Sequence, residues 1–166
     1  MSKPKTHTLQ FTRVFNAPRE DVFRAFSDPE AIKSWWAPKG WVTPYAEMDV
    51  RAGGRYRFGM CEEAGGDLMF VHGNYIAVEP PARLVFTYVW EGGVGGERWC
   101  EHGLIEVETV VTLEFRDHGE RTELLLRHEG FPTMEGRDQH RNGWGSNWDS
   151  LDDFVVRGIV KSSDRV

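Results

Sequence analysis

Three side chains in this sequence are our candidates for an acid or base that transfers a proton, namely His72, Tyr88 and His140. Histidine titrates in this range most readily, and general acid–base catalysis uses it most often. His140 stands one helical turn before Trp144 in a segment with a helical pattern, which makes it the first candidate. The alternative interpretation is structural, because a buried polar side chain usually pairs with the backbone or with another side chain.

The chain is rich in aromatic residues, with 7 Trp, 10 Phe and 4 Tyr. Ligand pockets are mostly apolar and aromatic, with a few polar groups that orient the ligand. We therefore predict a pocket, with ordinary core packing as the alternative. The predicted wall consists of Trp35, Trp36, Phe70, His72, Tyr88, Trp90, Trp99, Phe131, His140 and Trp144. Further polar residues on otherwise apolar faces are Asn74, His128 and Asn147.

Metal and cofactor chemistry find little support in the sequence. Cys100 and His102 are two potential zinc ligands, whereas zinc sites need three or four. The metalloprotease pattern HExxH, the nucleophile elbow GxSxG and the dinucleotide-binding pattern GxGxxG are absent from the sequence. We therefore predict no metal site and no cofactor.

The composition is that of a soluble globular domain, with 40% apolar and 28% charged residues among 166. The net charge of −6 argues against nucleic acid as a partner, because phosphate binding needs a basic face. The sequence has neither an apolar run long enough to span a membrane nor a signal peptide. We therefore expect a cytoplasmic protein without a membrane partner. The sequence leaves the oligomeric state open, a homodimer included.

The first part of the chain predicts a strand followed by two short helices. Residues 8–16 have the pattern of a strand, and Asn16 with Pro18 is a typical helix start, a capping residue before a proline. Asp28 and Pro29 repeat this signal, which predicts a second short helix directly after the first.

In the middle of the chain the hydrophobic period changes from 3.6 to 2, which predicts consecutive strands and hence an antiparallel sheet. The alternation is clearest over residues 105–115. Residues 68–78 form one long strand on which Phe70 and His72 share a face, and we predict that both belong to the pocket. Arg57 is predicted to lie on a solvated face of its own strand, beside acidic residues.

A long amphipathic helix is predicted at the C-terminal end, opening at Pro132 and Thr133. Gly143 and Gly145 lower helix stability by up to about 1 kcal/mol each relative to alanine. We expect their small size to let the helix approach the sheet closely. At 100° per residue, one arc of this helix collects His140, Trp144, Asn147, Trp148, Leu151, Phe154 and Val155.

Residues 91–104 form a long, glycine-rich connection between two predicted strands. A connection of more than about 12 residues is usually functional or disordered. The glycines give it freedom to move, and Trp99 is suited to cover a pocket mouth. We therefore predict a lid, with a plain hairpin end as the alternative.

Several separated motifs resemble those of a known family. They are Asn16-Ala17-Pro18-Arg19-Glu20-Asp21-Val22-Phe23, Trp35-Trp36-Ala37-Pro38-Lys39-Gly40, Gly53-Gly54-Arg55-Tyr56-Arg57-Phe58, Gly73-Asn74-Tyr75, His128-Glu129-Gly130-Phe131-Pro132 and His140-Arg141-Asn142-Gly143-Trp144. The family is that of domains similar to the activator of heat-shock protein 90 ATPase, a branch of the START-like (SRPBCC) superfamily. The resemblance spans residues 8–156, nearly the whole chain.

The resemblance implies an α+β fold of the helix-grip type, also called START-like or Bet v-like. In this fold a curved antiparallel sheet of about seven strands surrounds a long C-terminal helix, two short helices follow the first strand, and an apolar cavity lies between sheet and helix. We assign residues 8–160 to one such domain, residues 1–7 to a loosely held N-terminus and residues 161–166 to a tail.

Three functions are compatible with this reading. The first is binding of a hydrophobic small molecule in the cavity. The second is an enzyme of the cyclase, dehydratase or hydrolase kind that uses His140, His72 or Tyr88 as acid or base. The third is a co-chaperone-like interaction module. The co-chaperones that name the family carry a further N-terminal domain, whereas seven residues precede the first predicted strand here, so a chaperone partner is not favoured.

Overall fold

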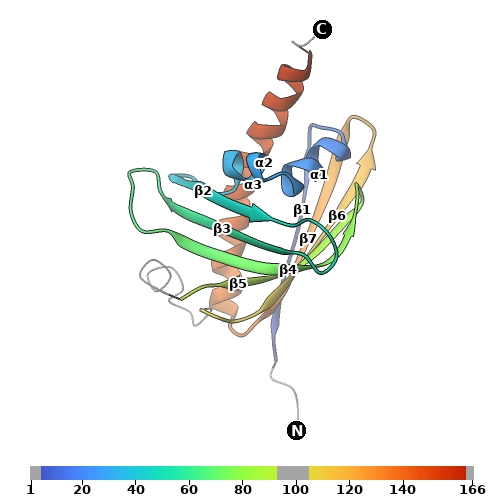
Figure 1. The fold of residues 1–166 in the computed structure, drawn as a ribbon. Helices are drawn as coiled ribbons and strands as arrows, with labels where there is room; N and C mark the ends of the chain where they lie inside the picture. Colours follow the sequence, from blue (N-terminus) through green and yellow to red (C-terminus); the bar gives the residue numbers. More distant parts are fainter. Residues whose placement is uncertain (1–4, 93–104, 164–166) are drawn as a thin grey trace.

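The strands and helices follow one another in the predicted order in the computed structural model, which describes residues 5–92 and 105–163 (Figure 1). The elements are β1 (His7–Phe15), α1 (Arg19–Ser27), α2 (Pro29–Trp35), β2 (Trp41–Met48), β3 (Arg55–Glu62), β4 (Met69–Glu79), β5 (Arg83–Trp90), β6 (Thr109–His118), β7 (Arg121–Phe131) and α3 (Met134–Ser163).

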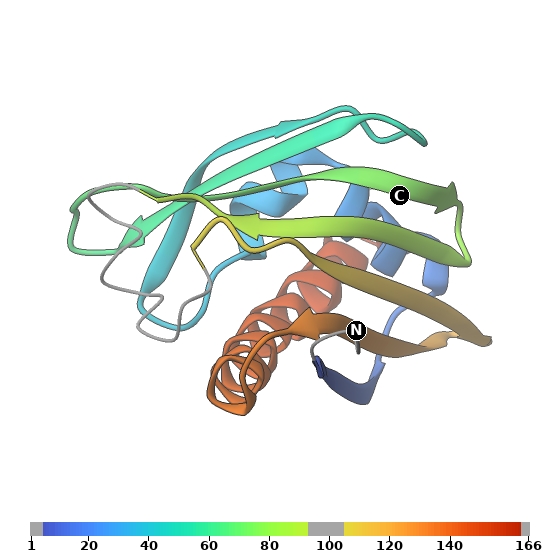
Figure 2. The same cartoon turned by 90° about the horizontal axis from the view of Figure 1, so that it is seen from below.

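The described strands form one antiparallel sheet in the order β1-β7-β6-β5-β4-β3-β2. Register shifts interrupt the β1–β7, β2–β3 and β4–β5 pairs, and such irregularities increase the local bend and twist of a sheet. The sheet curves around α3, which lies along its concave side (Figure 2). This arrangement confirms the predicted helix-grip fold.

Side chains that alternate along the strands build the core. On β6, Thr109, Val111, Leu113 and Phe115 are all buried, as the alternation predicts. The strand is shorter than predicted, because it begins at Thr109 rather than at residue 105. Before it the chain turns through Glu106, which has a φ of +60°. The alternation of apolar residues therefore begins before the first residue that pairs in the sheet.

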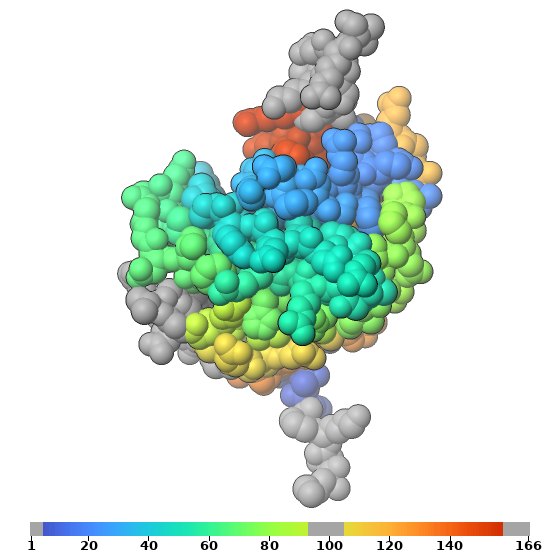
Figure 3. All heavy atoms as spheres, viewed as in Figure 1, coloured from blue at the N-terminus to red at the C-terminus, as the bar shows by residue number. Residues whose placement is uncertain are grey.

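The two short helices begin differently from one another. Asp28 caps α2 as predicted, because its carboxylate accepts a hydrogen bond of 3.0 Å from the Glu30 N–H. The prediction for α1 was wrong in detail. Pro18, not Asn16, is the N-cap residue, and it supplies no side-chain cap. Figure 3 shows α1 and α2, in blue, packed against the part of α3 that emerges beside them, in red-orange.

The long helix α3 presents the predicted arc to the core, with Phe154 half-buried and the other arc residues buried. The expected role of Gly143 and Gly145 was wrong. A Cβ atom added at either position would meet no atom within 4 Å, so neither glycine is needed for a close approach to the sheet. Among the described helices, α3 included, none has an apolar stretch long enough to span a bilayer.

Candidate ligand-binding site

A small cavity lies between α3, the residues that follow α2, and strands β3 and β5. Its volume is about 30 Å³. Pockets for drug-sized ligands measure about 300–1,000 Å³, so aromatic side chains occupy most of the space here. The described wall consists of Trp36, Pro38, Met60, Tyr88, Trp90, Gln139, His140, Gly143, Trp144 and Asn147.

His140 takes part in this wall through a hydrogen bond with a tryptophan. The indole Nε1–H of Trp90 donates to His140 Nε2 over 2.8 Å. Since Nε2 accepts, the proton of the neutral ring lies on Nδ1, which donates to the carbonyl oxygen of Gly136, 2.8 Å away. Both ring nitrogens of His140 are therefore hydrogen-bonded, Nε2 to a residue of β5 and Nδ1 to the preceding turn of α3.

His128, on β7, is held in a second indole–imidazole pair. Trp144 Nε1–H donates to His128 Nδ1 over 3.1 Å, so the ring proton lies on Nε2. That Nε2–H donates to the hydroxyl of Thr109 over 2.7 Å, and the hydroxyl in turn donates to the Tyr88 carbonyl over 3.0 Å. This chain of hydrogen bonds links α3 to three neighbouring strands, β7, β6 and β5.

Both histidines are neutral at neutral pH. Burial lowers the pKa of His140 to about 4, although the hydrogen bond to Gly136 acts in the opposite direction. Burial also brings the pKa of His128 well below its ordinary value, and the nearby His140 adds to this effect. Neither ring therefore carries the second proton that a general acid would donate.

Trp36 and Asn147 each bring to the cavity wall a polar atom that has no hydrogen-bond partner among the described residues. These atoms are Trp36 Nε1, a donor, and Asn147 Oδ1, an acceptor. Trp36 is 2% exposed and Asn147 is 8% exposed, so solvent does not readily reach either side chain. The neighbouring Trp35 differs, since its Nε1–H donates to the carbonyl oxygen of Ala25 over 2.8 Å.

Trp36 also lines a second cavity. The second cavity measures about 10 Å³ and is apolar, and its wall shares Trp36 with the first. The backbone of Trp36 is held, because its carbonyl accepts from the Thr43 hydroxyl and its N–H donates to Ile32. The indole nitrogen, by contrast, has no partner in the described ranges, and the ring packs edge-on against Phe58 and Trp144.

The structure brings five of the predicted pocket residues together in one wall, and they are Trp36, Tyr88, Trp90, His140 and Trp144. Two others lie in the core beside the cavity and are not part of its described wall. Trp35 packs edge-on against Phe26. Phe131 packs against both His128 and His140. Trp99 and most of the predicted lid lie outside the described residues.

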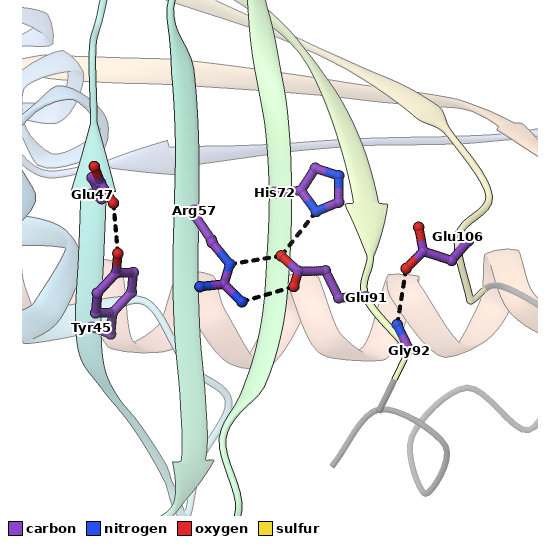
Figure 4. Close-up of polar contacts among 7 residues, drawn as sticks. All are labelled: Tyr45, Glu47, Arg57, His72, Glu91, Gly92 and Glu106. Atoms are coloured by element: carbon purple, nitrogen blue, oxygen red, sulfur yellow. Dashed lines mark hydrogen bonds and ion pairs between the residues drawn. The ribbon is translucent and has the colours of Figure 1, made fainter. Parts of the chain in front are cut away.

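Phe70 and His72 lie on the opposite, outer face of the sheet, apart from the cavity wall. Figure 4 shows His72 on this face, beside Arg57 and Glu91. The prediction that Phe70 and His72 share a face is correct, but the residues of β4 that point inward are Met69, Val71 and Tyr75. The ring of Phe70 is half-buried because the guanidinium of Arg57 stacks over it, 3.7 Å from the ring centroid. A cation thus covers the apolar ring on this outer face.

Arg57 also forms an ion pair with Glu91, as predicted for a solvated face with acidic neighbours. Arg57 Nε and Nη2 donate to the two carboxylate oxygens of Glu91 over 2.8 and 2.9 Å, and His72 Nδ1 lies 2.9 Å from Glu91 Oε2 (Figure 4). The hydrogen bonds from Arg57, and to a lesser extent the one from His72, lower the pKa of Glu91 against the effect of its partial burial. This cluster joins β3, β4 and the end of β5.

Sequence reasoning missed several members of the wall: Pro38, Met60, Gln139 and Gly143. Met60 was detectable, since it continues the alternation of Tyr56 and Phe58 along β3. Asn147 was recognised as a polar residue on an apolar face but was not placed in the pocket. No local signal distinguishes it from Asn74, which is exposed on the outer face.

The order of the elements and the position of α3 recur in known proteins. Residues 16–155 match the family described as Activator of Hsp90 ATPase homolog 1-like protein. The chain belongs to this family. Protein CV1439 from Chromobacterium violaceum is 27% identical to this family member, with a TM-score of 0.74 over 90% of this chain and 97% of that one.

Two further solved structures share the fold. The AHSA1 protein from Silicibacter pomeroyi is 23% identical, with a TM-score of 0.76 over 92% of this chain and 99% of that one. CalU16 from Micromonospora echinospora is 21% identical, with a TM-score of 0.63 over 96% of this chain and 83% of that one. No protein of curated function matches the chain.

Proposed function

We propose that this Hsp90-activator-like protein binds a small hydrophobic molecule in the cavity between α3 and the sheet. The observation that carries the proposal is the wall itself, in which Trp36, Tyr88, Trp90 and Trp144 gather around one cavity. Small-molecule sites are typically concave and aromatic, with few polar groups. This wall has that composition.

The small volume of the cavity means that a ligand must displace a side chain. Trp90 and Trp144 are poor candidates for this movement, because each indole N–H is bonded to a buried histidine. Trp36 loses no indole hydrogen bond to a described residue when its ring turns, and it lines both cavities. We therefore infer that Trp36 is the side chain that shifts to enlarge the site, and that its indole N–H stays available to the ligand.

The same hydrogen bonds favour binding over acid–base catalysis. For His140 to accept a proton, its Nε2 would first have to release the Trp90 indole, and for it to donate one, Nδ1 would have to release Gly136. Leaving a buried donor or acceptor unpaired costs about 1–3 kcal/mol. A carrier or sensor has no such requirement.

The direct test is native mass spectrometry of the protein purified gently from its host. We expect an adduct of small-molecule mass, together with a rise in melting temperature when the extracted compound is added back. A Gly143→Leu variant should lose the adduct, because Gly143 lines the cavity and its missing Cβ faces open space.

The matched control is Gly145→Leu, which makes the same change two residues away, where the helix does not line the cavity. This variant should keep the adduct. Equal adduct occupancy in both leucine variants would place the ligand elsewhere and overturn the proposed site. Two null results together would overturn the binding function itself. They are the absence of any adduct and a screen of neutral aromatic compounds in which none raises the melting temperature.

A further inference from the structure

The described cavity wall is uncharged. Its members are aromatic, apolar or neutral polar side chains, and His140 is neutral with both ring nitrogens engaged. An ionised group in this cavity would lose its hydration and meet no opposite charge among the described wall residues. The site is therefore suited to a neutral molecule.

The wall nevertheless contains a donor, Trp36 Nε1, and an acceptor, Asn147 Oδ1, on different elements that find no partner in the described part of the chain. Trp36 is the C-cap residue that follows α2, Asn147 lies in the middle of α3, and both residues line the same cavity. Buried polar atoms are rarely left unpaired, and each such case calls for an explanation. A bound molecule that accepts from one atom and donates to the other would explain both.

We infer that Trp36 and Asn147 form a polar anchor that selects neutral ligands carrying a hydroxyl or amide group on an apolar, ring-sized body. A hydroxyl is the smallest group that accepts from an indole N–H and donates to an amide oxygen. This inference rests on the proposed function, because it assigns the chemical class of the molecule that the cavity takes.

The water that a ligand displaces bears on its affinity. A volume of about 30 Å³ has room for roughly two water molecules, which a ligand in this cavity would displace. A ligand that displaces such water without replacing its hydrogen bonds loses affinity. A purely apolar ligand would leave Trp36 Nε1 and Asn147 Oδ1 unpaired, whereas a hydroxyl or amide ligand would not.

The test compares three molecules of similar shape: p-cresol, p-xylene and the anion 4-methylbenzoate. Their dissociation constants are measured by ligand-observed NMR titration at pH 7. We expect p-cresol to bind about tenfold more tightly than p-xylene, as two modest hydrogen bonds would give. We expect no binding of 4-methylbenzoate.

Asn147→Leu, a change of similar shape, should reduce the preference for p-cresol to within about threefold and leave p-xylene binding equal or tighter. Trp36→Phe keeps an aromatic ring but removes the N–H, so it should also reduce the preference for p-cresol over p-xylene. It replaces Asn147→Leu in the test if that variant folds poorly. Asn142→Leu makes the same change on the exposed face of α3 and should keep the full preference.

The outcomes separate the inference from the proposed function. Binding of p-xylene as tight as that of p-cresol, or a preference that survives in both anchor variants, would overturn the polar anchor while leaving the cavity a binding site. Binding of 4-methylbenzoate as tight as that of p-cresol would overturn the assignment of neutral ligands. If none of the three molecules binds the wild-type protein, both the anchor and the proposed function fail.

Discussion

Trp90 and His140 lie 50 residues apart in the chain, and a hydrogen bond of 2.8 Å joins their rings. A second bond of the same kind joins Trp144 and His128. The two bonds run in opposite directions between α3 and the sheet, because α3 supplies the imidazole of one pair and the indole of the other. They hold the helix over the concave face and fix three of the rings nearest to the cavity.

The two bonds have a measurable contribution to stability. In Trp144→Phe the Nδ1 atom of His128 loses its donor while buried, whereas in Trp148→Phe no hydrogen bond is lost, since the Trp148 indole nitrogen has no partner among the described residues. Both changes remove the same atoms from the core. We expect Trp144→Phe to lower the free energy of unfolding by about 1–3 kcal/mol more than Trp148→Phe. Equal losses in urea denaturation would contradict this.

Stability should fall as the pH drops below neutral. In the unfolded chain the pKa of His140 returns to about 6.5, whereas in the folded protein it is about 4. Between these values the unfolded state binds a proton that the folded state does not, so acid favours unfolding. His128 acts in the same direction.

This effect is measured as the free energy of unfolding at pH 7, 6 and 5. Below pH 6.5 each buried histidine should contribute a slope of about 1 kcal/mol per pH unit. His140→Gln should reduce that slope. His118→Gln, at an exposed position on the β6–β7 turn, is the control that should keep it. An unchanged slope in His140→Gln would contradict the prediction.

Replacing either of two glycines in α3 by alanine should stabilise the protein. A Cβ at Gly143 or Gly145 meets nothing within 4 Å, so Gly→Ala at either site should raise the free energy of unfolding by up to about 1 kcal/mol. Gly73→Ala should have the opposite effect, because its Cβ would lie 2.0 Å from the Thr87 carbonyl oxygen. Thermal and urea denaturation of the three variants checks the signs. A destabilised Gly145→Ala would show that the helix needs that glycine.

The outer cluster of Arg57, Glu91 and His72 should be independent of the cavity. Its side chains are partly exposed, so Glu91→Gln should change stability by less than about 1 kcal/mol. Phe70→Leu and His72→Ala should leave the p-xylene dissociation constant unchanged, since neither residue lines the cavity wall. A loss of binding as large as that of Gly143→Leu would show that the outer face contributes to the site.

Much of the fold could be predicted from local pattern. The buried arc of α3 from His140 to Val155 follows from the 3.6-residue period, and the buried set on β6 and β7 follows from the period of two. These periods act within one element, so no neighbour is needed to detect them. The cap at Asp28 is local for the same reason.

The face of β4 that points inward was decided by the tertiary structure. Both faces of this strand carry apolar residues. A period of two shows which residues share a face, but it does not show which face points into the core. The register with β3 places Arg57 opposite His72, and the guanidinium then covers Phe70 on the outside. Arg57, 13 positions before Phe70 in the sequence, thus allows this apolar ring, which we predicted in the pocket, to lie on the outer face instead.

The sequence by itself determined that an aromatic-rich helix-grip domain forms and which residues of α3 face its sheet. Only the tertiary structure decided that the cavity is small and that Trp90 and Trp144 are bonded to histidines. It also decided that Trp36 Nε1 and Asn147 Oδ1 find no partner among the residues it describes. The physical reason is that hydrophobic period is a property of one segment. A cavity volume and a hydrogen-bond partner depend on where several distant segments meet.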